Sequence, residues 1–249
     1  MATSGRRKGV SVTNNGVGSV WAVVAAAGES MRMGLPDGES KQFLLLGGQP
    51  IITHSVRRLL NMPEIAGVVC VLHPSHTVRF ASQLMVLDES KPLLIAEGGR
   101  ERYDSVRAGL MQVPDDVEVI AIHDGARPLF SRHVFEACLR ALQGADGAVP
   151  GCPITDTLKL SRADGHVEAT IDRRGLWAVQ TPQLFRAAAL RAAYAKAEFA
   201  GATDDATLLE RGGHKVVVVP STPANVKITT AADLPLAGAL LSWETEADV

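Results

Sequence analysis

The sequence has few cysteines and no long apolar run, and each shortage excludes a class of protein. Its three cysteines, Cys70, Cys138 and Cys152, lie far apart, with no Cys-x-x-Cys pair and no histidine at metal-binding spacing. Neither a zinc site nor a disulfide framework is expected, and the thiols are predicted to be buried and reduced. No apolar run approaches the roughly 18 residues of a membrane span. The N-terminus lacks the apolar core of a secretory signal, so a cytoplasmic location is expected.

Net charge is also low, at −2 over 249 residues. The protein therefore has no overall field that would attract nucleic acid or an anionic membrane, and neither partner is expected. An anionic ligand has to be bound by a local basic cluster. A hydrophobic content of 46% and a charged content of 21% are typical of a globular protein of one α/β domain.

The first nineteen residues differ in composition from the rest. They are rich in Ser, Thr, Gly and Asn and carry Arg6, Arg7 and Lys8 without an acid. A transit peptide is one interpretation, but there are too few apolar residues for an amphipathic targeting helix. We predict a disordered tail over 1–19 and a single domain over 20–249.

From Val20 onward, strand patterns alternate with helical patterns. The predicted strands are 20–25, 67–72, 93–96, 117–122, 147–150 and 215–219. The predicted helices include 51–60, 104–113, 131–143, 186–200, 204–211 and a last one from about Ala231. This alternation predicts a three-layer α/β fold with a mostly parallel sheet and right-handed crossovers.

The alternation stops between Ile154 and Phe185. Thr, Asp, Arg and Gly are mixed there with single apolar residues around a central Ala163-Asp164-Gly165 turn signal. We interpret this segment, about 154–185, as a β-hairpin arm that projects from the sheet.

Ligands of a parallel sheet bind at the carboxyl ends of its strands, so the residues directly after the first predicted strand are candidates for a ligand site. The run from Ala25 to Gly34 has small residues that let a ligand approach the backbone, and Arg32 and Lys41 add positive charge. A polyphosphate cradle and a plain strand-to-helix turn both fit this pattern. The glycine spacings of a dinucleotide fold and of a P-loop are missing.

Five segments in order resemble one family. The run from Ala26-Ala27-Gly28 to Arg32-Met33, followed by Lys41-Gln42-Phe43, resembles the nucleotide-binding signature of sugar-nucleotidyltransferase-like cytidylyltransferases. The other matching segments are Gly98 to Val106, His123 to Pro128, the arm with Asp156 to Lys159, Asp172-Arg173 and Thr181 to Gln183, and Thr203 to Asp205 with Asn225 to Thr229. Together they cover 20 to about 241, and the chain is thereby identified as similar to the 2-C-methyl-D-erythritol 4-phosphate cytidylyltransferases.

The chain departs from the family pattern in its first loop. Ser30 stands where the family usually has a second glycine, and Ser40 stands where it usually has a proline before the lysine. The loop also contains the inserted residues 36–39. The reach of Lys41 is therefore less well defined than its identity.

The resemblance implies a Rossmann-like nucleotidyltransferase fold and three groups of site residues. Those that bind CTP are Ala26, Ala27, Gly28, Gly99, Ser105 and Asp124. Those that act on the reacting phosphates are Arg32, Lys41, Lys227 and Arg173. Those that bind the acceptor are Arg127, Thr157, Arg173 and Thr181, the arm residues coming from the second subunit of a homodimer. Asp124 is also the expected ligand of Mg²⁺, which needs few protein carboxylates.

Each residue also has a purely structural interpretation. Asp124, directly after the most apolar strand, is otherwise a buried structural acid. Lys227, in a predicted short strand that returns to the sheet, is otherwise a solvated lysine, and Ser105 is otherwise a helix cap. His123 is interpreted as structural.

The expected reaction is transfer of CMP from CTP to 2-C-methyl-D-erythritol 4-phosphate, with release of pyrophosphate. A cytidylyltransferase for another polyol phosphate, such as ribitol 5-phosphate, is the nearest alternative, and the Asp172-Arg173 pair and the Thr181-Pro182-Gln183 turn favour the first acceptor by resemblance. A non-catalytic nucleotide-binding protein would be expected to lack one of Arg32, Lys41 and Lys227. A nicotinamide oxidoreductase is disfavoured because its glycine spacing is missing.

Overall fold

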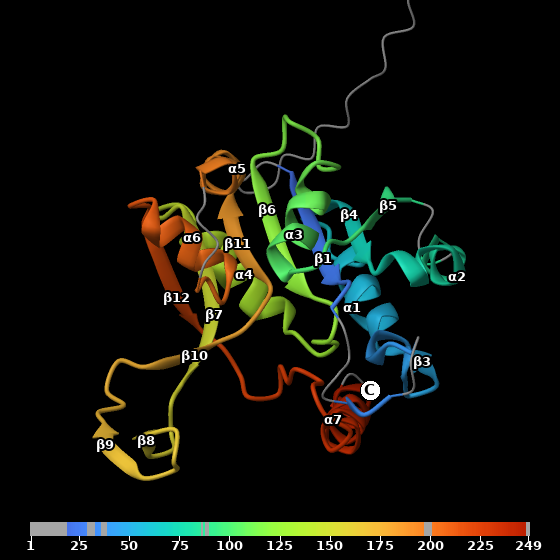
Figure 1. The fold of residues 1–249 in the computed structure, drawn as a ribbon. Coiled ribbons are helices and arrows are strands. Elements are labelled where there is room, and N and C mark those ends of the chain that lie inside the picture. Colours follow the sequence, from blue (N-terminus) through green and yellow to red (C-terminus); the bar gives the residue numbers. More distant parts are fainter. Residues whose placement is uncertain are drawn as a thin grey trace, which may run out of the picture.

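One eight-stranded sheet organises the fold (Figure 1). The computed structural model describes residues 19–28, 33–35, 39–85, 87, 90–196 and 201–247. The strands of the sheet are β1 (Val20–Ala26), β4 (Ile65–Leu72), β5 (Leu93–Glu97), β6 (Val119–Asp124), β7 (Gly147–Pro153), β10 (Trp177–Val179), β11 (Gln183–Arg186) and β12 (Val216–Pro220). Their spatial order is β10, β7, β11, β6, β1, β4 and β5, with β12 also paired to β7.

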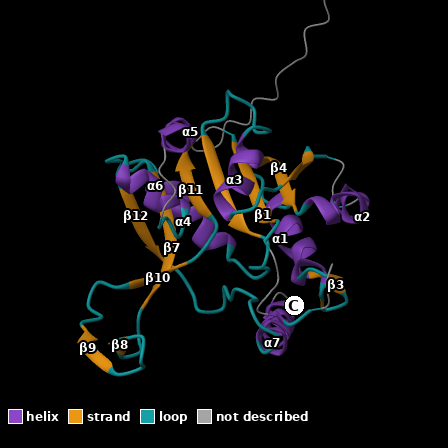
Figure 2. Ribbon diagram, viewed as in Figure 1, coloured by secondary structure: helices purple, strands orange, loops and turns teal. Residues whose placement is uncertain are grey.

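Helices cover both faces of this sheet (Figure 2). Side chains alternate along a strand, so Val20, Ala22 and Val24 of β1 point to one core and Trp21 and Val23 to the other. The first core contains α1 (Ile51–Leu60), α2 (Pro74–Met85) and α4 (Arg132–Ala141). The second contains α3 (Arg102–Leu110), α5 (Ala187–Lys196) and α6 (Asp205–Arg211). The predicted three-layer α/β fold is confirmed.

Four neighbouring strands, β6, β1, β4 and the edge strand β5, run parallel, which brings their carboxyl ends to the same end of the sheet. β1 is parallel to both β4 and β6, and β4 is parallel to β5. The strand predicted over 117–122 is observed as β6 over Val119–Asp124, so it begins later and continues through His123 and Asp124, which are both buried. The helix predicted over 51–60 is observed with those limits.

The arm leaves the sheet after β7 and carries a small hairpin, β8 (Leu158–Ser161) paired with β9 (Val167–Ile171) (Figure 1, lower left). Gly165 lies in the turn with φ +84°, as the Ala-Asp-Gly signal predicts. The predicted limit at Phe185 is wrong. Residues Gln183–Arg186 form β11, which lies between β6 and β7, is antiparallel to both, and is buried at Gln183, Leu184 and Phe185.

The segment before the last helix is also different from its prediction. Residues 225–228 do not form a strand, although the Ile228 N–H donates to the Ala126 carbonyl at 2.9 Å. Ile228 is buried instead against α7 (Asp233–Ala247), Leu46 and Leu129. Nearby lie the 3₁₀ turn η2 (Lys41–Phe43) and the hairpin β2 (Leu45–Leu46) and β3 (Gln49–Pro50). Within the described residues, no helix is both long and apolar enough to span a membrane.

Candidate active site

A cavity of about 240 Å³ opens at the carboxyl edge of the parallel strands. Its walls come from β1, η2, the loop between β5 and α3, the end of β6 and the segment before α7. The lining residues are Ala25, Ala27, Gly28, Lys41, Gln42, Gly99, Arg100, Glu101, Arg102, Ser105, Asp124, Ala126 and Lys227. Cations outnumber acids on this wall by four to two, so the cavity favours an anion.

Glycines allow the wall between β1 and α3 to form. A β-carbon at Gly98 would lie 2.2 Å from the Ala27 β-carbon, and one at Gly99 would lie 2.3 Å from the Asp104 β-carbon. Both distances are too short for any larger residue. Gly28 has open space where its β-carbon would be, on the cavity side of β1. Packing within the wall therefore requires glycine at 98 and 99, whereas Gly28 is not required by packing, and the approach of a ligand to these residues stays a prediction.

Ser105 lies inside α3 and not at its start. Glu101 is the N-cap residue, and its N–H donates to the Asp104 carboxylate at 3.3 Å. The Ser105 hydroxyl donates to the Glu101 carbonyl at 3.2 Å and lines the cavity. The helix-cap interpretation of Ser105 is wrong, because the cap position falls earlier in the chain.

Asp124 is the electrostatic centre of the site. Its carboxylate lies 2.7 Å from Lys227 Nζ, 3.4 Å from Arg102 Nε and 3.7 Å from Arg127 Nε. Burial alone would raise the pKa of Asp124, but the charges of Arg102 and Lys227 outweigh it and hold this pKa well below its usual range. The carboxylate is thus ionised and keeps three cations in one place.

We expect Asp124→Asn to lower the free energy of unfolding at neutral pH, and to lower it less in acid. The folded pKa is depressed, so the ion pairs stabilise the fold above the unfolded pKa of about 3.9 and this contribution is lost as pH falls through the folded pKa. Urea unfolding of the wild-type protein and of Asp124→Asn, from neutral to acid pH, measures the difference in the free energy of unfolding. Asp156→Asn, an exposed acid of the arm, is the control. A deficit for Asp124→Asn that is equal in acid and at neutral pH would contradict this account.

The two predicted lysines approach each other from opposite ends of the chain. Lys41 Nζ donates to the carbonyl of Ile228 at 3.0 Å, and Ile228 directly follows Lys227 in the chain. Ser40, the departure from the family pattern, caps η2 by accepting from the Gln42 N–H at 3.4 Å and so stabilises the turn that carries Lys41. Arg32 lies outside the described residues, as do Ser30 and residues 36–38 of the insertion.

Arg127 and Thr181 lie beside Asp124. Arg127 Nη1 donates to the Asn225 carbonyl at 2.7 Å. The Thr181 hydroxyl accepts from the Asp124 N–H at 3.0 Å and contacts His123 Nδ1 at 3.0 Å. Both predicted acceptor residues are therefore next to the predicted nucleotide site of their own chain, and the expectation that Thr181 reaches the site of a second subunit is wrong.

Thr157 and Arg173 are placed differently. Both are exposed on the arm, and Arg173 donates to the Thr155 carbonyl. Neither lines the cavity of its own chain. The structure brings together the predicted residues of the sheet edge and leaves these two apart.

Arg102 is a site residue for which the sequence suggested no role. It joins two acids, lying 3.4 Å from Asp124 and 2.7 Å from Asp205. Burial would lower the pKa of Arg102, but Asp205 and Asp124 outweigh it and the pKa is raised. A signal for Arg102 was available in the sequence, because this residue follows Gly99 by three positions in the segment Gly98 to Val106, which resembles the family.

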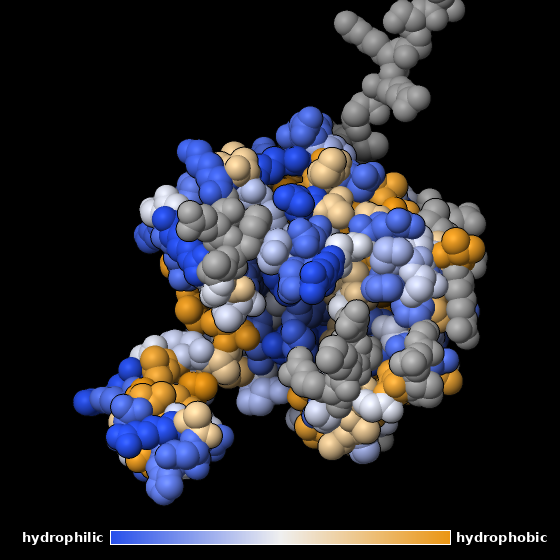
Figure 3. Space-filling model, in the orientation of Figure 1, coloured by the Kyte–Doolittle hydropathy of each residue, from blue (hydrophilic) through white to orange (hydrophobic). Residues whose placement is uncertain are grey.

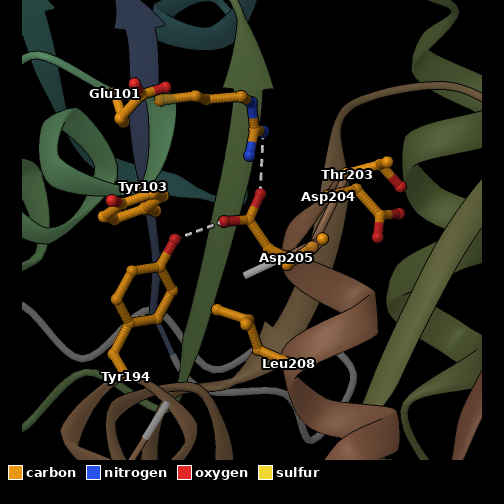
Figure 4. Close-up of a pocket in the computed structure, with 10 residues that line it drawn as sticks. Glu101, Tyr103, Tyr194, Thr203, Asp204, Asp205 and Leu208 are labelled. Carbon is orange, nitrogen blue, oxygen red and sulfur yellow. Dashed lines mark hydrogen bonds and ion pairs between the residues drawn. The ribbon is translucent and has the colours of Figure 1, made fainter. Parts of the chain in front are cut away.

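A second cavity, of about 330 Å³, also has Arg102 in its wall. Figure 4 shows Tyr103, Tyr194, Asp204, Asp205 and Leu208 around it. The Tyr194 hydroxyl donates to Asp205 at 2.5 Å. Burial and the Asp205 charge raise the pKa of Tyr194, so it remains a donor at neutral pH.

Comparisons with known proteins identify the family of the chain. The sequence model of the family IspD, 2-C-methyl-D-erythritol 4-phosphate cytidylyltransferase, matches residues 20–243. Proteins of that name from Syntrophus aciditrophicus and Synechocystis are each 38% identical to the chain, over 90% and 88% of it and over 97% and 95% of their own lengths. The crystal structure of 4-diphosphocytidyl-2C-methyl-D-erythritol synthase from Anaerococcus prevotii superposes with a TM-score of 0.78 at 26% identity, covering 90% of this chain and 96% of that one. The chain belongs to the 2-C-methyl-D-erythritol 4-phosphate cytidylyltransferase family.

Proposed function

We propose that the cavity binds CTP and that the protein transfers its CMP to 2-C-methyl-D-erythritol 4-phosphate, a step in isoprenoid precursor synthesis. The products are 4-diphosphocytidyl-2-C-methyl-D-erythritol and pyrophosphate. The observation that carries this proposal is the ionised Asp124 in contact with Lys227 and Arg102, beside a wall that only glycine can form. The proposed reaction follows from family membership, and the proposed location of the active site follows from this cluster.

The chemistry needs positioned charge more than acid–base groups. An oxygen of the acceptor phosphate attacks the α-phosphorus of CTP, the bond from that phosphorus to the bridging oxygen breaks, and pyrophosphate leaves. A phosphate monoester has a second pKa of about 6, so the nucleophile is already ionised at neutral pH. Lys41 and Lys227, with Arg32 as predicted from the sequence, would stabilise the charge that develops. No general base is required.

The wall at α3 suits cytosine. Ser105 gives its proton to the Glu101 carbonyl and keeps its lone pairs free to accept another hydrogen bond. Cytosine has an amino group that can donate to this hydroxyl, whereas uracil has a carbonyl group at the same ring position. Ala26, Ala27, Gly28 and Gly99 would leave room for the nucleoside against the backbone.

Mg²⁺ fits this site when it arrives with the triphosphate. Asp124 is ionised and offers a hard oxygen ligand, but it is already in contact with cations, so phosphate oxygens would have to share the metal. Among the described residues, no group of three or more acids, histidines or cysteines could hold a metal alone. Bound there, the ion would neutralise charge on the departing pyrophosphate.

The arm supports a homodimer. Figure 3 shows it standing apart from the body with apolar side chains on its surface, and Leu160 and Val167 are 48% and 61% exposed. Hydrophobic residues on an isolated two-stranded hairpin are stabilised when they pack against another surface. Thr157 and Arg173 of each chain would then complete the acceptor site of the partner, where an arginine can bind phosphate with two hydrogen bonds.

Sedimentation equilibrium at micromolar concentration is expected to give twice the chain mass of 26.4 kDa. The physical reason is burial of the apolar arm surface in the dimer. A single species at the chain mass would count against the dimer and against a shared acceptor site.

Pyrophosphate release tests the substrate assignment. Each nucleoside triphosphate is supplied with either 2-C-methyl-D-erythritol 4-phosphate or ribitol 5-phosphate. We expect CTP with the first acceptor to give the largest kcat/KM; faster turnover with ribitol 5-phosphate would favour the alternative cytidylyltransferase. We also propose that the protein works in the cytoplasm, where nucleoside triphosphates are available.

A further inference from the structure

His123 is a fully buried polar side chain beside the carboxylate of the site. It is the second-last residue of β6, it is 0% exposed, and its ring meets Phe130 edge-on at 4.6 Å between centroids. A buried polar group is costly unless it is hydrogen-bonded. Both ring nitrogens have partners: Nδ1 lies 3.0 Å from Thr181 Oγ1, and Nε2 lies 3.1 Å from the Arg127 carbonyl oxygen.

The direction of each hydrogen bond can be deduced. The Arg127 carbonyl can only accept, so Nε2 carries the proton and donates. The buried Thr181 hydroxyl already accepts from the Asp124 N–H, and among the described contacts Nδ1 is the acceptor for its proton, so Nδ1 carries no proton and the ring is neutral. The Thr181 hydroxyl therefore donates to Nδ1 and accepts from the Asp124 N–H. One orientation of the chain of hydrogen bonds satisfies all of these groups.

This chain of hydrogen bonds holds both ends of the turn from Asp124 to Arg127. The Asp124 N–H is bound by Thr181, the Arg127 carbonyl is bound by His123, and the Arg127 N–H donates to the Asp124 carbonyl at 3.0 Å. Within the turn, the Ala126 carbonyl accepts from Ile228, next to Lys227. The imidazole thus links the two ends of this turn, which is also held where the Gly125 N–H donates to the Ala25 carbonyl and the Ser55 hydroxyl donates to the Gly125 carbonyl.

We propose that His123, as the neutral tautomer protonated at Nε2, is a positioning residue for nucleotidyl transfer that fixes the turn carrying Asp124 and Arg127. It acts without touching substrate, because its ring is fully buried and both of its nitrogens are bound within the protein. This inference rests on the proposed function. A histidine that only fills the core would also need hydrogen bonds, but any buried polar group could supply them. The partners of His123 are instead the carbonyl of Arg127 and the hydroxyl of Thr181, which itself binds the Asp124 N–H.

The tautomer can be measured in the intact wild-type protein. Long-range ¹H–¹⁵N correlation of the histidine rings, assigned by the loss of one set of signals in His123→Asn, should show His123 with a proton on Nε2 only. The signal should not change across the neutral pH range. A proton on Nδ1, or a doubly protonated ring at neutral pH, would overturn the proposal.

Kinetics tests the positioning role. His123→Phe keeps a flat ring without nitrogens and is expected to lower kcat/KM by about 10- to 100-fold, since small displacements of site groups have effects of this size. His123→Asn keeps an acceptor for Thr181 and should fall between wild type and His123→Phe. The double variant with Thr181→Val and His123→Phe should lose less kcat/KM than the product of the two single-variant losses. The reason is that both changes break the same chain of hydrogen bonds.

A stability control separates positioning from folding. Phe135→Leu changes another buried ring of the first core and should lower the melting temperature without a change in kcat/KM per folded molecule. If His123→Phe and His123→Asn behave like Phe135→Leu, the proposal is wrong. If wild-type protein does not turn over CTP and the acceptor, the proposed function fails instead, and the two failures are distinguishable.

Discussion

Lys227→Ala is expected to lower kcat/KM for CMP transfer by roughly a hundredfold or more, because it removes a cation directed at developing phosphate charge. Lys227 Nζ lies 2.7 Å from Asp124 and lines the cavity, while its side chain is 39% exposed. Truncation therefore removes charge without leaving a hole in the core. Initial rates of pyrophosphate release over a range of CTP concentrations measure the loss.

A matched lysine controls for charge and expression. Lys215→Ala removes an exposed lysine from the start of the last strand region and should leave kcat/KM unchanged. Turnover near wild type in folded Lys227→Ala would remove this residue from the assignment. Arg32→Ala carries the same expectation from the sequence, although Arg32 lies outside the described residues.

Two inactive variants, Arg173→Ala and Lys227→Ala, are expected to regain activity when they are co-expressed. Arg173 is on the arm and does not line the cavity of its own chain, whereas Lys227 does. If the arm reaches the partner, a mixed dimer has one site with both residues intact and one site with neither. With random pairing about half of the dimers are mixed, so activity should reach roughly a quarter of wild type per site.

The same experiment has a clear opposite result. Differently tagged chains allow the mixed dimer to be isolated, and its rate is compared with that of each parent. If Arg173 serves its own chain, every site in the mixed dimer lacks one residue. A mixed dimer no more active than the sum of its parents would show this and would reverse the proposed arm exchange.

The parts of the fold that follow from local pattern could be predicted from the sequence. The helix over 51–60 has apolar residues at helical spacing, and the strands around β1 and β4 are short, β-branched and bounded by polar loops. The Ala163-Asp164-Gly165 signal placed the hairpin turn correctly, because only a residue such as glycine readily adopts its positive φ. Local residue preferences and side-chain periodicity determine these features.

Other features depend on contacts distant in sequence. β11 reads as part of the arm because its four residues show no strand period, and burial between β6 and β7 decides its structure. The segment with Ile228 alternates like a strand, yet it packs under α7. Arg102 acquires its role from Asp124 and Asp205, which lie on other elements. A single sequence gives no register for such pairs.

The fate of the three phosphates of CTP tests the central claim most directly. CTP is labelled with ³²P at either the α or the γ position and incubated with the protein, Mg²⁺ and 2-C-methyl-D-erythritol 4-phosphate. We expect the α label in a product that contains cytidine and the acceptor, and the γ label in pyrophosphate. A γ label in the acceptor product, or no transfer of the α label, would contradict nucleotidyl transfer at this site.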